Sequence, residues 1–311
     1  MGIAALASAQ DFPRRPVRLL VPFAPGGTTD VVTRGAAQRL GATWNQQVVV
    51  DNRPGGGSLI AVEIVANAVP DGHTLLTTGT SVVVNTSTPL APPGVKIDIE
   101  RDFAHIILFA TGANVLSVRA ASPLKSLKDV ITAARARPAS LTYGSSGFGS
   151  SNHFSGELLM AQAGIKLVHV PYKGNAPALT DAVGGQIDLV FAGVPAQQAL
   201  LKAGRLRALA IGSKQRFALI PDVPTFSEAG LPGYEMPNYF GLSAPAGTAR
   251  ATVAKIHRDC EALLKQPEFV QQLQGDGLTP QGGAPESFAH YLRERQVQLT
   301  QLIKAADIRQ K

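Results

Sequence analysis

The chain has 311 residues, of which 45% are hydrophobic and 16% are charged, so it is long enough for two α/β lobes and too apolar to be disordered. Its formal net charge is +7, but the 29 Lys and Arg residues are scattered along the chain and are not interleaved with aromatic residues. A nucleic-acid-binding protein gathers its basic residues on one segment or face. The charge pattern therefore predicts no nucleic-acid partner, and it mildly favours anionic ligands.

The first ten residues, MGIAALASAQ, have the composition of the end of an export signal. Ala7, Ser8 and Ala9 form the small-x-small pattern of a signal-peptidase site, although the positively charged start of such a signal is missing. We interpret residues 1–10 as the remnant of an export signal. No stretch of the sequence approaches the roughly 18 apolar residues that a membrane-spanning helix requires.

The single cysteine, Cys260, excludes an intramolecular disulfide and a cysteine-based metal site. It falls in a predicted helix at residues 250–265, where we expect it to be a small packing residue. The six histidines include no His-x-x-x-His pair. The sequence therefore predicts neither a metal site nor a cofactor.

The first eighty residues follow the order strand, glycine turn and helix twice, and then add a strand. Residues 17–23 and 48–50 are apolar runs, and each is followed by a glycine-rich turn and an apolar-periodic segment, the first from Asp30 and the second over residues 59–68. Residues 74–78 form the third strand. This β-α-β-α-β order predicts a parallel sheet with right-handed crossovers.

A second alternating series predicts a second lobe. It follows residues 106–118, a long apolar stretch in which residues 111–114, TGAN, predict a break and the first crossing between lobes. Helices are predicted at residues 127–137, 151–163, 176–183 and 195–203, and strands at residues 141–143, 167–170, 187–191 and 206–211. An extended run at residues 239–244 returns the chain to the first lobe, and the remainder is mostly helical. We therefore predict an α/β chain with lobe 1 at residues 12–110 plus 236–311, lobe 2 at residues 111–235, and two hinge-crossing segments.

Two similar glycine turns, one in each predicted lobe, carry the functional hypothesis. They are residues 22–30, PFAPGGTTD, and residues 143–153, YGSSGFGSSNH. Each turn follows a strand and opens a helix, whose first amides lack internal partners and whose dipole favours an anion. One helix end contributes only about 0.3–1 kcal/mol, whereas micromolar binding needs about 8 kcal/mol. Two turns that close on one carboxylate, with hydrogen bonds of about 1.5–3 kcal/mol each, would together supply a binding free energy of this size.

Serine chemistry is an alternative interpretation of the second turn. Ser146 and Ser150 lie close in sequence to His153, as a nucleophile and a base would. However, residues 144–147, GSSG, are one residue too short for the Gly-x-Ser-x-Gly elbow, and no acidic partner for His153 stands out. A periplasmic serine hydrolase therefore remains the rival from the enzyme class.

At these turns the sequence resembles the tripartite tricarboxylate transporter substrate-binding proteins, also called the Bug family of periplasmic receptors. Several further stretches match the family in order: VVVDNRPG at residues 48–55, DGHTLL at 71–76, VPYKG at 170–174 and PDVPT at 221–225. The resemblance runs from about Phe12 to the end of the chain. It implies a two-lobed periplasmic-binding-protein fold of the Venus-flytrap, type II-like kind, with no enzymatic activity.

The resemblance also implies a small organic carboxylate bound between the lobes and delivery to a membrane transporter with two membrane subunits. We expect a periplasmic monomer, and the few charged residues near the turns favour a ligand that is not strongly polyanionic. A module that reports ligand occupancy to a membrane sensor uses the same closed form and remains a further alternative.

The resemblance assigns ligand-holding positions to both turns and to four further residues. Asp30 also fits a helix-capping role, and Tyr172 fits either stacking on a ligand or packing at the hinge. The predicted ligand-binding residues are Phe23, Gly26, Gly27, Thr28, Asp30, Thr80, Ser81, Ser146, Gly147, Gly149, Ser150, His153, Tyr172 and Gly193.

Overall fold

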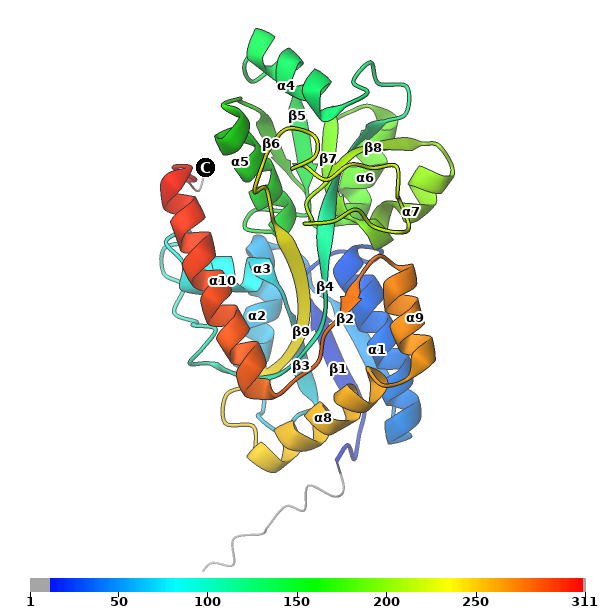
Figure 1. The fold of residues 1–311 in the computed structure, drawn as a ribbon. Helices are drawn as coiled ribbons and strands as arrows, with labels where there is room; N and C mark the ends of the chain where they lie inside the picture. Colours follow the sequence, from blue (N-terminus) through cyan, green and yellow to red (C-terminus); the bar gives the residue numbers. More distant parts are fainter. Residues whose placement is uncertain (1–11, 310–311) are drawn as a thin grey trace, which may run out of the picture.

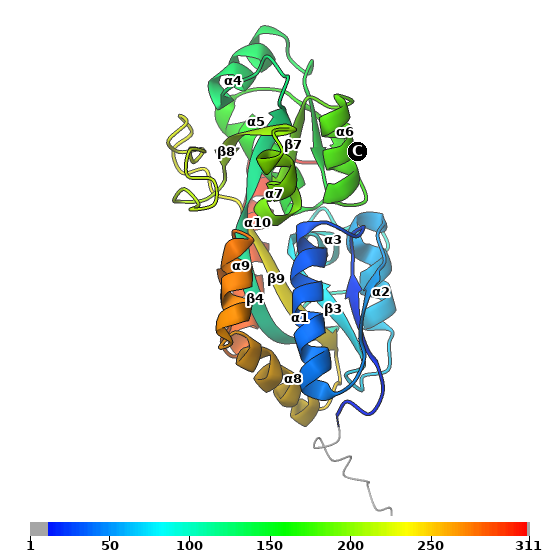
Figure 2. The ribbon, with the colours of Figure 1, turned by 90° about the vertical axis from the view of Figure 1, so that its right-hand side faces the viewer.

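A computed structural model describes residues 12–309 of the chain (Figure 1). The predicted export-signal remnant at residues 1–10 lies outside the described residues. Within residues 12–309, ten strands form a sheet in the order β2-β1-β3-β9-β4-β7-β5-β6, and β8 and β10 pair with β4 as well. The sheet extends through two lobes stacked end to end, which Figures 1 and 2 show from two sides.

The first lobe contains the start of the described chain and its last three helices. Its strands are β1 (Val17–Val21), β2 (Val48–Asn52), β3 (Thr74–Thr78), β9 (Pro237–Pro245), β10 (Thr279–Pro280) and the first part of β4 (Phe103–Arg119). Its helices are α1 (Thr28–Trp44), α2 (Leu59–Ala66), α3 (Thr80–Ser87), α8 (Arg250–Leu263), α9 (Pro267–Gly275) and α10 (Pro285–Ala305), with a short 3-10 helix at Gly56–Ser58.

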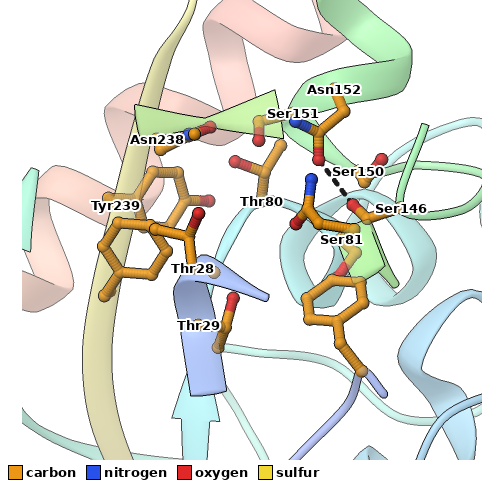
Figure 3. A pocket seen from close by; sticks show the side chains of 15 residues that line it. Thr28, Thr29, Thr80, Ser81, Ser146, Ser150, Ser151, Asn152, Asn238 and Tyr239 are labelled. Atoms are coloured by element: carbon orange, nitrogen blue, oxygen red, sulfur yellow. Dashed lines mark hydrogen bonds between the residues drawn. The ribbon is translucent and has the colours of Figure 1, made fainter. Parts of the chain in front are cut away.

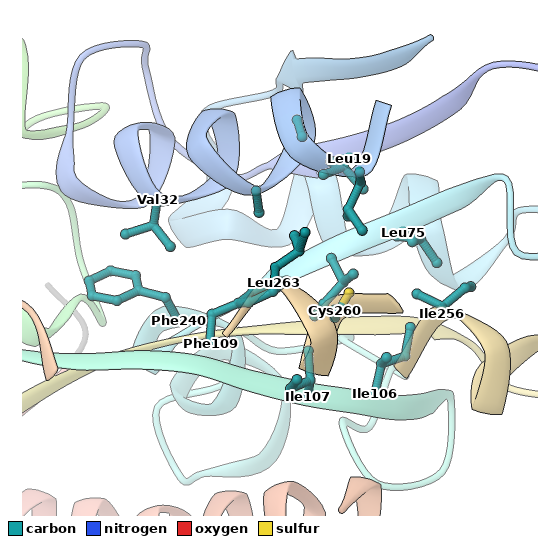
Figure 4. Packing of buried hydrophobic residues seen from close by; sticks show 14 of the residues in the cluster. Leu19, Val32, Leu75, Ile106, Ile107, Phe109, Phe240, Ile256, Cys260 and Leu263 are labelled. Atoms are coloured by element: carbon teal, nitrogen blue, oxygen red, sulfur yellow. The ribbon is translucent and has the colours of Figure 1, made fainter. Parts of the chain in front are cut away.

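The first-lobe sheet is buried between two layers of helices. Leu19 of β1 and Leu75 of β3 pack on one face against α1, α8 and α9, whereas the next residue of each strand, Leu20 or Leu76, packs on the other face against α2, α3 and α10. This alternation explains why the strands read as unbroken apolar runs. Cys260 is fully buried in the first of these clusters, and burial raises the pKa of its thiol, so it is a packing residue as expected (Figure 4).

The second lobe repeats the same three-layer arrangement. Its strands are β5 (Thr142–Ser145), β6 (Val168–Pro171), β7 (Leu189–Gly193), β8 (Leu206–Ile211) and the second part of β4. Its helices are α4 (Leu127–Ala136), α5 (Ser151–Ala163), α6 (Asn175–Gly184) and α7 (Val194–Lys202). Helices α4 and α5 cover one face of the sheet, and α6 and α7 cover the other.

Two strands, β4 and β9, connect the lobes (Figure 1). Along β4 the pairing changes at one step, because Ala113 pairs with Pro237 of β9 whereas Asn114 pairs with Gly193 of β7. The break predicted at residues 111–114 is wrong, since β4 is continuous over 17 residues and each of those four residues is paired with a neighbouring strand. The division into residues 12–110 plus 236–311 and residues 111–235 stays a prediction.

Most predicted elements match the observed ones within about two residues. The predicted parallel pairing is confirmed for β1 with β2 and with β3, and β9 and β4 then extend this sheet in the antiparallel sense. Helix α3 was not predicted from the sequence, and its first residue follows β3 after a single glycine. Within residues 12–309, none of the helices combines the length and the apolar character needed to cross a bilayer.

Candidate functional site

A cavity of about 30 Å³ lies where the two lobes meet (Figure 3). Both lobes contribute to its wall, and Asn238 contributes from the crossing strand β9. We call it the inner cavity. The residues that line it are Phe23, Thr28, Thr29, Gly79, Thr80, Ser81, Ser146, Ser150, Ser151, Asn152, Asn175, Gly193, Asn238, Tyr239 and Phe240.

Five helices begin at the wall of the inner cavity. They are α1 and α3 from the first lobe and α5, α6 and α7 from the second, and the N-cap or first residues of each line the cavity. Four of the five N-caps are glycines (Gly27, Gly79, Gly174 and Gly193), which cannot satisfy the first amides with a side chain. The positive ends of several helix dipoles therefore converge on one small space, which favours an anion there.

Several buried polar atoms at the inner cavity have no hydrogen-bond partner in the described part of the chain. They are Thr28 Oγ1, Ser81 Oγ, Asn175 Nδ2, Asn238 Oδ1 and the Tyr239 hydroxyl. All five residues are at least 92% buried, and an unpaired buried polar group costs about 1–3 kcal/mol. Their concentration around one cavity indicates that a polar guest completes their hydrogen bonding.

None of the described residues that line the inner cavity is charged, so the hydrogen-bonding groups that they provide are neutral. Burial raises the pKa of the Tyr239 hydroxyl and outweighs the opposing interaction with the Thr80 side chain, so this phenol stays protonated and able to donate. Any charge in the cavity would be matched by amides, hydroxyls and helix dipoles rather than by a salt bridge.

The asparagine side chains behind the inner cavity form a buried network. Asn114 Oδ1 accepts hydrogen bonds from Asn152 Nδ2 at 2.8 Å and from Asn238 Nδ2 at 2.7 Å, and Asn114 Nδ2 donates to Ser155 Oγ at 2.9 Å. Asn152 Oδ1 also accepts from Ser146 Oγ at 2.5 Å (Figure 3). The network ties β4, β9 and α5 together at the level where the chain crosses between lobes.

The lobes touch on more than one side of the inner cavity, so the structure is a closed form. Ala24 N donates to Lys173 O at 2.8 Å, and Gln198 Nε2 donates to Gly275 O at 3.2 Å. A methyl group added at Gly193 would lie 2.5 Å from Thr28 Oγ1, which shows how closely the end of β7 approaches the start of α1.

A second, larger cavity of about 240 Å³ lies beside the first and shares two wall residues with it, Phe23 and Ser146. We call it the outer cavity. Phe148, Tyr172 and Lys173 also line it. The other lining residues are Pro22, Gly55, Gly56, Gly57, Ser58, Gly147 and Pro171.

The structure brings half of the predicted site residues to the inner cavity. Those that line it are Phe23, Thr28, Thr80, Ser81, Ser146, Ser150 and Gly193, and Gly147 and Tyr172 line the outer cavity. The remaining five, Gly26, Gly27, Asp30, Gly149 and His153, line neither cavity. Whether the predicted residues bind a ligand stays a prediction.

Three predicted glycines lie in close contacts between the lobes instead of in a cavity wall. Cβ atoms at Gly26 and Gly27 would lie 3.6 Å from Ala176 Cβ and 3.3 Å from Asn175 Oδ1. A Cβ at Gly149 would lie 2.4 Å from Asn85 Nδ2, and Gly149 has a φ of +75°. These contacts give the glycine turns a role in the packing of one lobe against the other, in addition to their role at the starts of helices.

Asp30 stabilises the first glycine turn from outside the cavities. Its carboxylate accepts hydrogen bonds from Gly26 N, Arg34 Nε and Asn52 Nδ2, each at 2.9 Å. Burial raises the pKa of Asp30, but these hydrogen bonds outweigh it and hold the pKa below its usual value. The residue therefore fits the structural role considered from the sequence.

His153 is not hydrogen bonded through its ring to either serine of the hydrolase alternative. Its Nδ1 accepts from Gly149 N at 3.3 Å, and its Nε2 lies 3.3 Å from Glu157 Oε1. The Ser150 hydroxyl donates to Gly147 O at 2.6 Å, and the Ser146 hydroxyl is held by the asparagine network. Neither Ser146 nor Ser150 is therefore paired with His153 as a nucleophile is with its base, and the serine that does contact a histidine ring here is Ser145, whose Oγ lies 2.7 Å from His169 Nε2.

Eight residues of the inner cavity were missed from the sequence: Thr29, Gly79, Ser151, Asn152, Asn175, Asn238, Tyr239 and Phe240. Three of them, Thr29, Ser151 and Asn152, lie inside the two glycine turns and carried a signal that could have been used. Asn175 carried a weaker signal, because it starts a helix after the Lys-Gly turn at residues 173–174. Asn238 and Tyr239 gave none, since nothing in the local sequence distinguishes them from other strand residues.

Comparison with known proteins identifies the family. The family model described as "Tripartite tricarboxylate transporter family receptor" (TctC) matches residues 31–308. The chain belongs to this family. It is thus a solute-binding protein, and the resemblance noted in the sequence is confirmed.

Relatives and solved structures agree with this assignment. A protein of Pseudomonas sp. (strain P51), described as "UPF0065 protein in tcbD-tcbE intergenic region", is 38% identical over 94% of this chain and 86% of its own length. The structure described as "R. palustris Rpa4515 with adipate" has a TM-score of 0.92 and 35% identity, covering 96% of this chain and 99% of the other. "MatC (Rpa3494) from Rhodopseudomonas palustris with bound malate" has a TM-score of 0.87 and 30% identity, covering 94% of this chain and 100% of the other. The predicted two-lobed periplasmic-binding-protein fold is confirmed.

Proposed function

We propose that the protein captures a small organic carboxylate in the inner cavity and delivers it to a tripartite tricarboxylate-type membrane transporter. The observation that carries the proposal is the convergence of five helix starts and five unpaired polar atoms on a cavity without charged side chains. A carboxylate is small enough for the cavity, accepts several hydrogen bonds at once and gains from the helix dipoles.

Hydrogen-bond donors outnumber obligatory acceptors among the unpaired atoms. The hydroxyls of Thr28, Ser81 and Tyr239 and the amide of Asn175 can all donate. Charge-assisted hydrogen bonds contribute about 1.5–3 kcal/mol each, and they are stronger where water is excluded. An anion therefore fits this set of groups better than a cation does.

Two similar structures support the ligand class, because one is described with adipate and the other with bound malate. Both of these proteins align with almost the whole of this chain. The proposed ligand of this protein is accordingly a carboxylate, held between the lobes of the closed form.

The family also supports the proposed cellular setting. A solved structure described as a periplasmic transporter has a TM-score of 0.91 and 38% identity to this chain. We infer a periplasmic receptor without enzymatic activity, which acts as a monomer and presents its closed form to a transporter with two membrane subunits. Release of the ligand then follows from opening about the two crossing strands.

Thermal unfolding of refolded, ligand-free protein tests the proposal. The panel consists of adipate, malate, citrate, benzoate and acidic amino acids, each beside its primary amide where one exists. At least one carboxylate is expected to raise Tm progressively with concentration, because a ligand at one hundred times its Kd stabilises the folded state by about 2.7 kcal/mol. Equal stabilisation by a carboxylate and its amide, or no response to any carboxylate, would contradict the proposal.

A further inference from the structure

We propose that the ligand is a carboxylate with an aromatic body, whose carboxylate occupies the inner cavity and whose ring occupies the outer cavity. This inference rests on the proposed function and adds the chemical class of the ligand. It follows from the sizes of the two cavities, from the side chains that they share and from the distribution of charge between them.

The inner cavity is too small for a complete organic acid. Its volume is about 30 Å³, and one water needs about 10–15 Å³, so it holds about two or three water-sized groups. A carboxylate group, with one carbon and two oxygens, has this size. The rest of any ligand must therefore leave the inner cavity.

The outer cavity provides the space for the rest of the ligand. Its volume is about 240 Å³, and Phe23 and Ser146 lie in the walls of both cavities. A ligand whose carboxylate reaches the inner cavity thus passes between these two side chains. Because one comes from each lobe, closure of the lobes fixes the position of the ligand between them.

The walls of the outer cavity favour a flat apolar group over a second carboxylate. Phe23, Phe148 and Tyr172 are all half-buried at this cavity, and two prolines complete the apolar surface. Partly exposed aromatic side chains that gather around one cavity are typical of a site for an apolar partner. A ring placed there removes their faces from water and stacks against them.

Charge in the outer cavity is confined to its rim. The single charged lining residue is Lys173, which is exposed, so a second carboxylate would lose hydration and gain only a screened interaction. Ser58 Oγ is buried at this cavity and has no partner in the described part of the chain. One neutral polar substituent on the ring, such as a hydroxyl group, would complete its hydrogen bonding.

Isothermal titration of the ligand-free protein with propionate, 3-phenylpropionate, 3-(hydroxyphenyl)propionate and adipate tests the inference. Phenylpropionate is expected to bind at least about 30-fold more tightly than propionate, as burial of a phenyl group predicts, and more tightly than adipate. Propionate that binds as tightly as phenylpropionate would show that the outer cavity is not used. Adipate that binds tenfold more tightly than both aryl acids would overturn the aromatic class while leaving the proposed function intact.

Two variants test the position of the ring. The readout is the ratio of the dissociation constants of phenylpropionate and propionate. Phe148→Leu and Tyr172→Leu are each expected to weaken phenylpropionate about tenfold and to leave propionate unchanged, whereas a structural defect would weaken both acids equally. Phe217→Leu, a change of the same kind outside both cavities, serves as the control. An unchanged ratio in both test variants would overturn the inference. Failure of every carboxylate to bind the wild-type protein would instead count against the proposed function itself.

Discussion

At the scale of single residues, the groups that the inner cavity offers to a ligand are neutral. Thr28, Ser81 and Tyr239 present hydroxyls to the inner cavity that find no partner among residues 12–309. Such groups are costly to bury unless a partner completes their hydrogen bonding. Under the proposed function, the same groups favour a guest that accepts hydrogen bonds.

Replacement of Thr28 by valine tests directly whether its hydroxyl serves ligand binding rather than stability. Thr28→Val keeps the shape of the side chain and removes an unpaired hydroxyl, so we expect the free energy of unfolding without ligand to be unchanged or slightly higher. Loss of one hydrogen bond to a carboxylate should weaken ligand binding about tenfold or more. Titration calorimetry measures the affinity, and Thr43→Val, on the exposed side of the same helix, is the control. Unchanged affinity in Thr28→Val would contradict the role of this hydroxyl.

His105 predicts a dependence of stability on pH. Burial, together with the charge of Arg293, lowers the pKa of His105 to about 4. The unfolded chain takes up this proton near pH 6.5 and the folded chain only near pH 4, so the unfolded state binds more protons between these values. The free energy of unfolding should therefore be unaffected by this group above pH 6.5 and fall as the pH drops toward 4, by up to about 3 kcal/mol.

Urea unfolding at pH 7, 5.5 and 4.5 measures this dependence. His105→Gln removes the titrating group and should flatten the decline, whereas His290→Gln, at an exposed position on α10, should leave it as in the wild type. Parallel curves for the wild type and His105→Gln would disprove the assignment.

Sequence alone located only part of the site, and the reason is geometric. Thr28, Ser146 and Ser150 were predictable, because a glycine turn that opens a helix fixes both the conformation and the exposure of its amides. Asn238 and Tyr239 reach the cavity from β9, about ninety residues beyond the second turn, and only the tertiary fold brings them there. His153 was predicted for the cavity, but helix geometry turns its ring toward Glu157 on the same helix.

At the scale of elements, the helix starts and the two crossing strands define the site together. Local periodicity predicted nearly all helices and strands, since apolar runs and glycine turns alternate clearly along the chain. It failed for α3, whose sequence TSVVVNTS favours a strand by β-branched content. Residues 80–86 are all buried, and α3 packs in the cluster with α2 and α10, so tertiary packing outweighs the local preference.

The break predicted in β4 failed for a related reason. The segment TGAN contains residues typical of a loop, but Gly112 and Ala113 pair with β9 and Asn114 pairs with β7. A Cβ at Gly112 would lie 2.7 Å from Leu278 Cδ2, so the glycine permits close packing within a strand.

Replacement of Asn114 by alanine tests the coupling between the crossing strands and α5. Asn114→Ala leaves the side-chain amides of Asn152 and Asn238 without their shared acceptor, so we expect a loss of about 2–4 kcal/mol in the free energy of unfolding and weaker ligand binding. Urea unfolding measures the first effect and calorimetry the second. Asn67→Ala, at an exposed helix end, should cost no more than about 1 kcal/mol. Equal losses in the free energy of unfolding for Asn114→Ala and Asn67→Ala would contradict a structural role for the asparagine network.

At the scale of the whole molecule, closure of the lobes forms the inner cavity. The backbone of the first glycine turn contacts the Lys-Gly turn of the second lobe, and Gly193 packs directly on Thr28. Glycines at these contacts allow an approach that a side chain would prevent. We therefore expect the unliganded protein to open about β4 and β9, and the ligand to favour the closed form.

Gly193→Ala tests closure without changing a hydrogen-bonding group. The φ of Gly193 is −66°, which alanine adopts readily, so the open form should be unaffected. In the closed form the added methyl group would collide with Thr28, so we expect about tenfold weaker ligand binding and a larger radius of gyration at saturating ligand by small-angle X-ray scattering. Gly184→Ala, whose added carbon would have its nearest neighbour at 4.0 Å, is the control. Closure equal to the wild type in Gly193→Ala would refute this description of the contact.

The most direct measurement is a crystal structure of the protein with a carboxylate that stabilises it. We predict that the carboxylate group lies between the starts of the five helices, with its oxygens within hydrogen-bonding distance of Thr28, Ser81 or Tyr239 and of a first-turn amide from each lobe. A carboxylate bound outside the inner cavity, or one that points to solvent while its apolar body fills that cavity, would contradict the central claim.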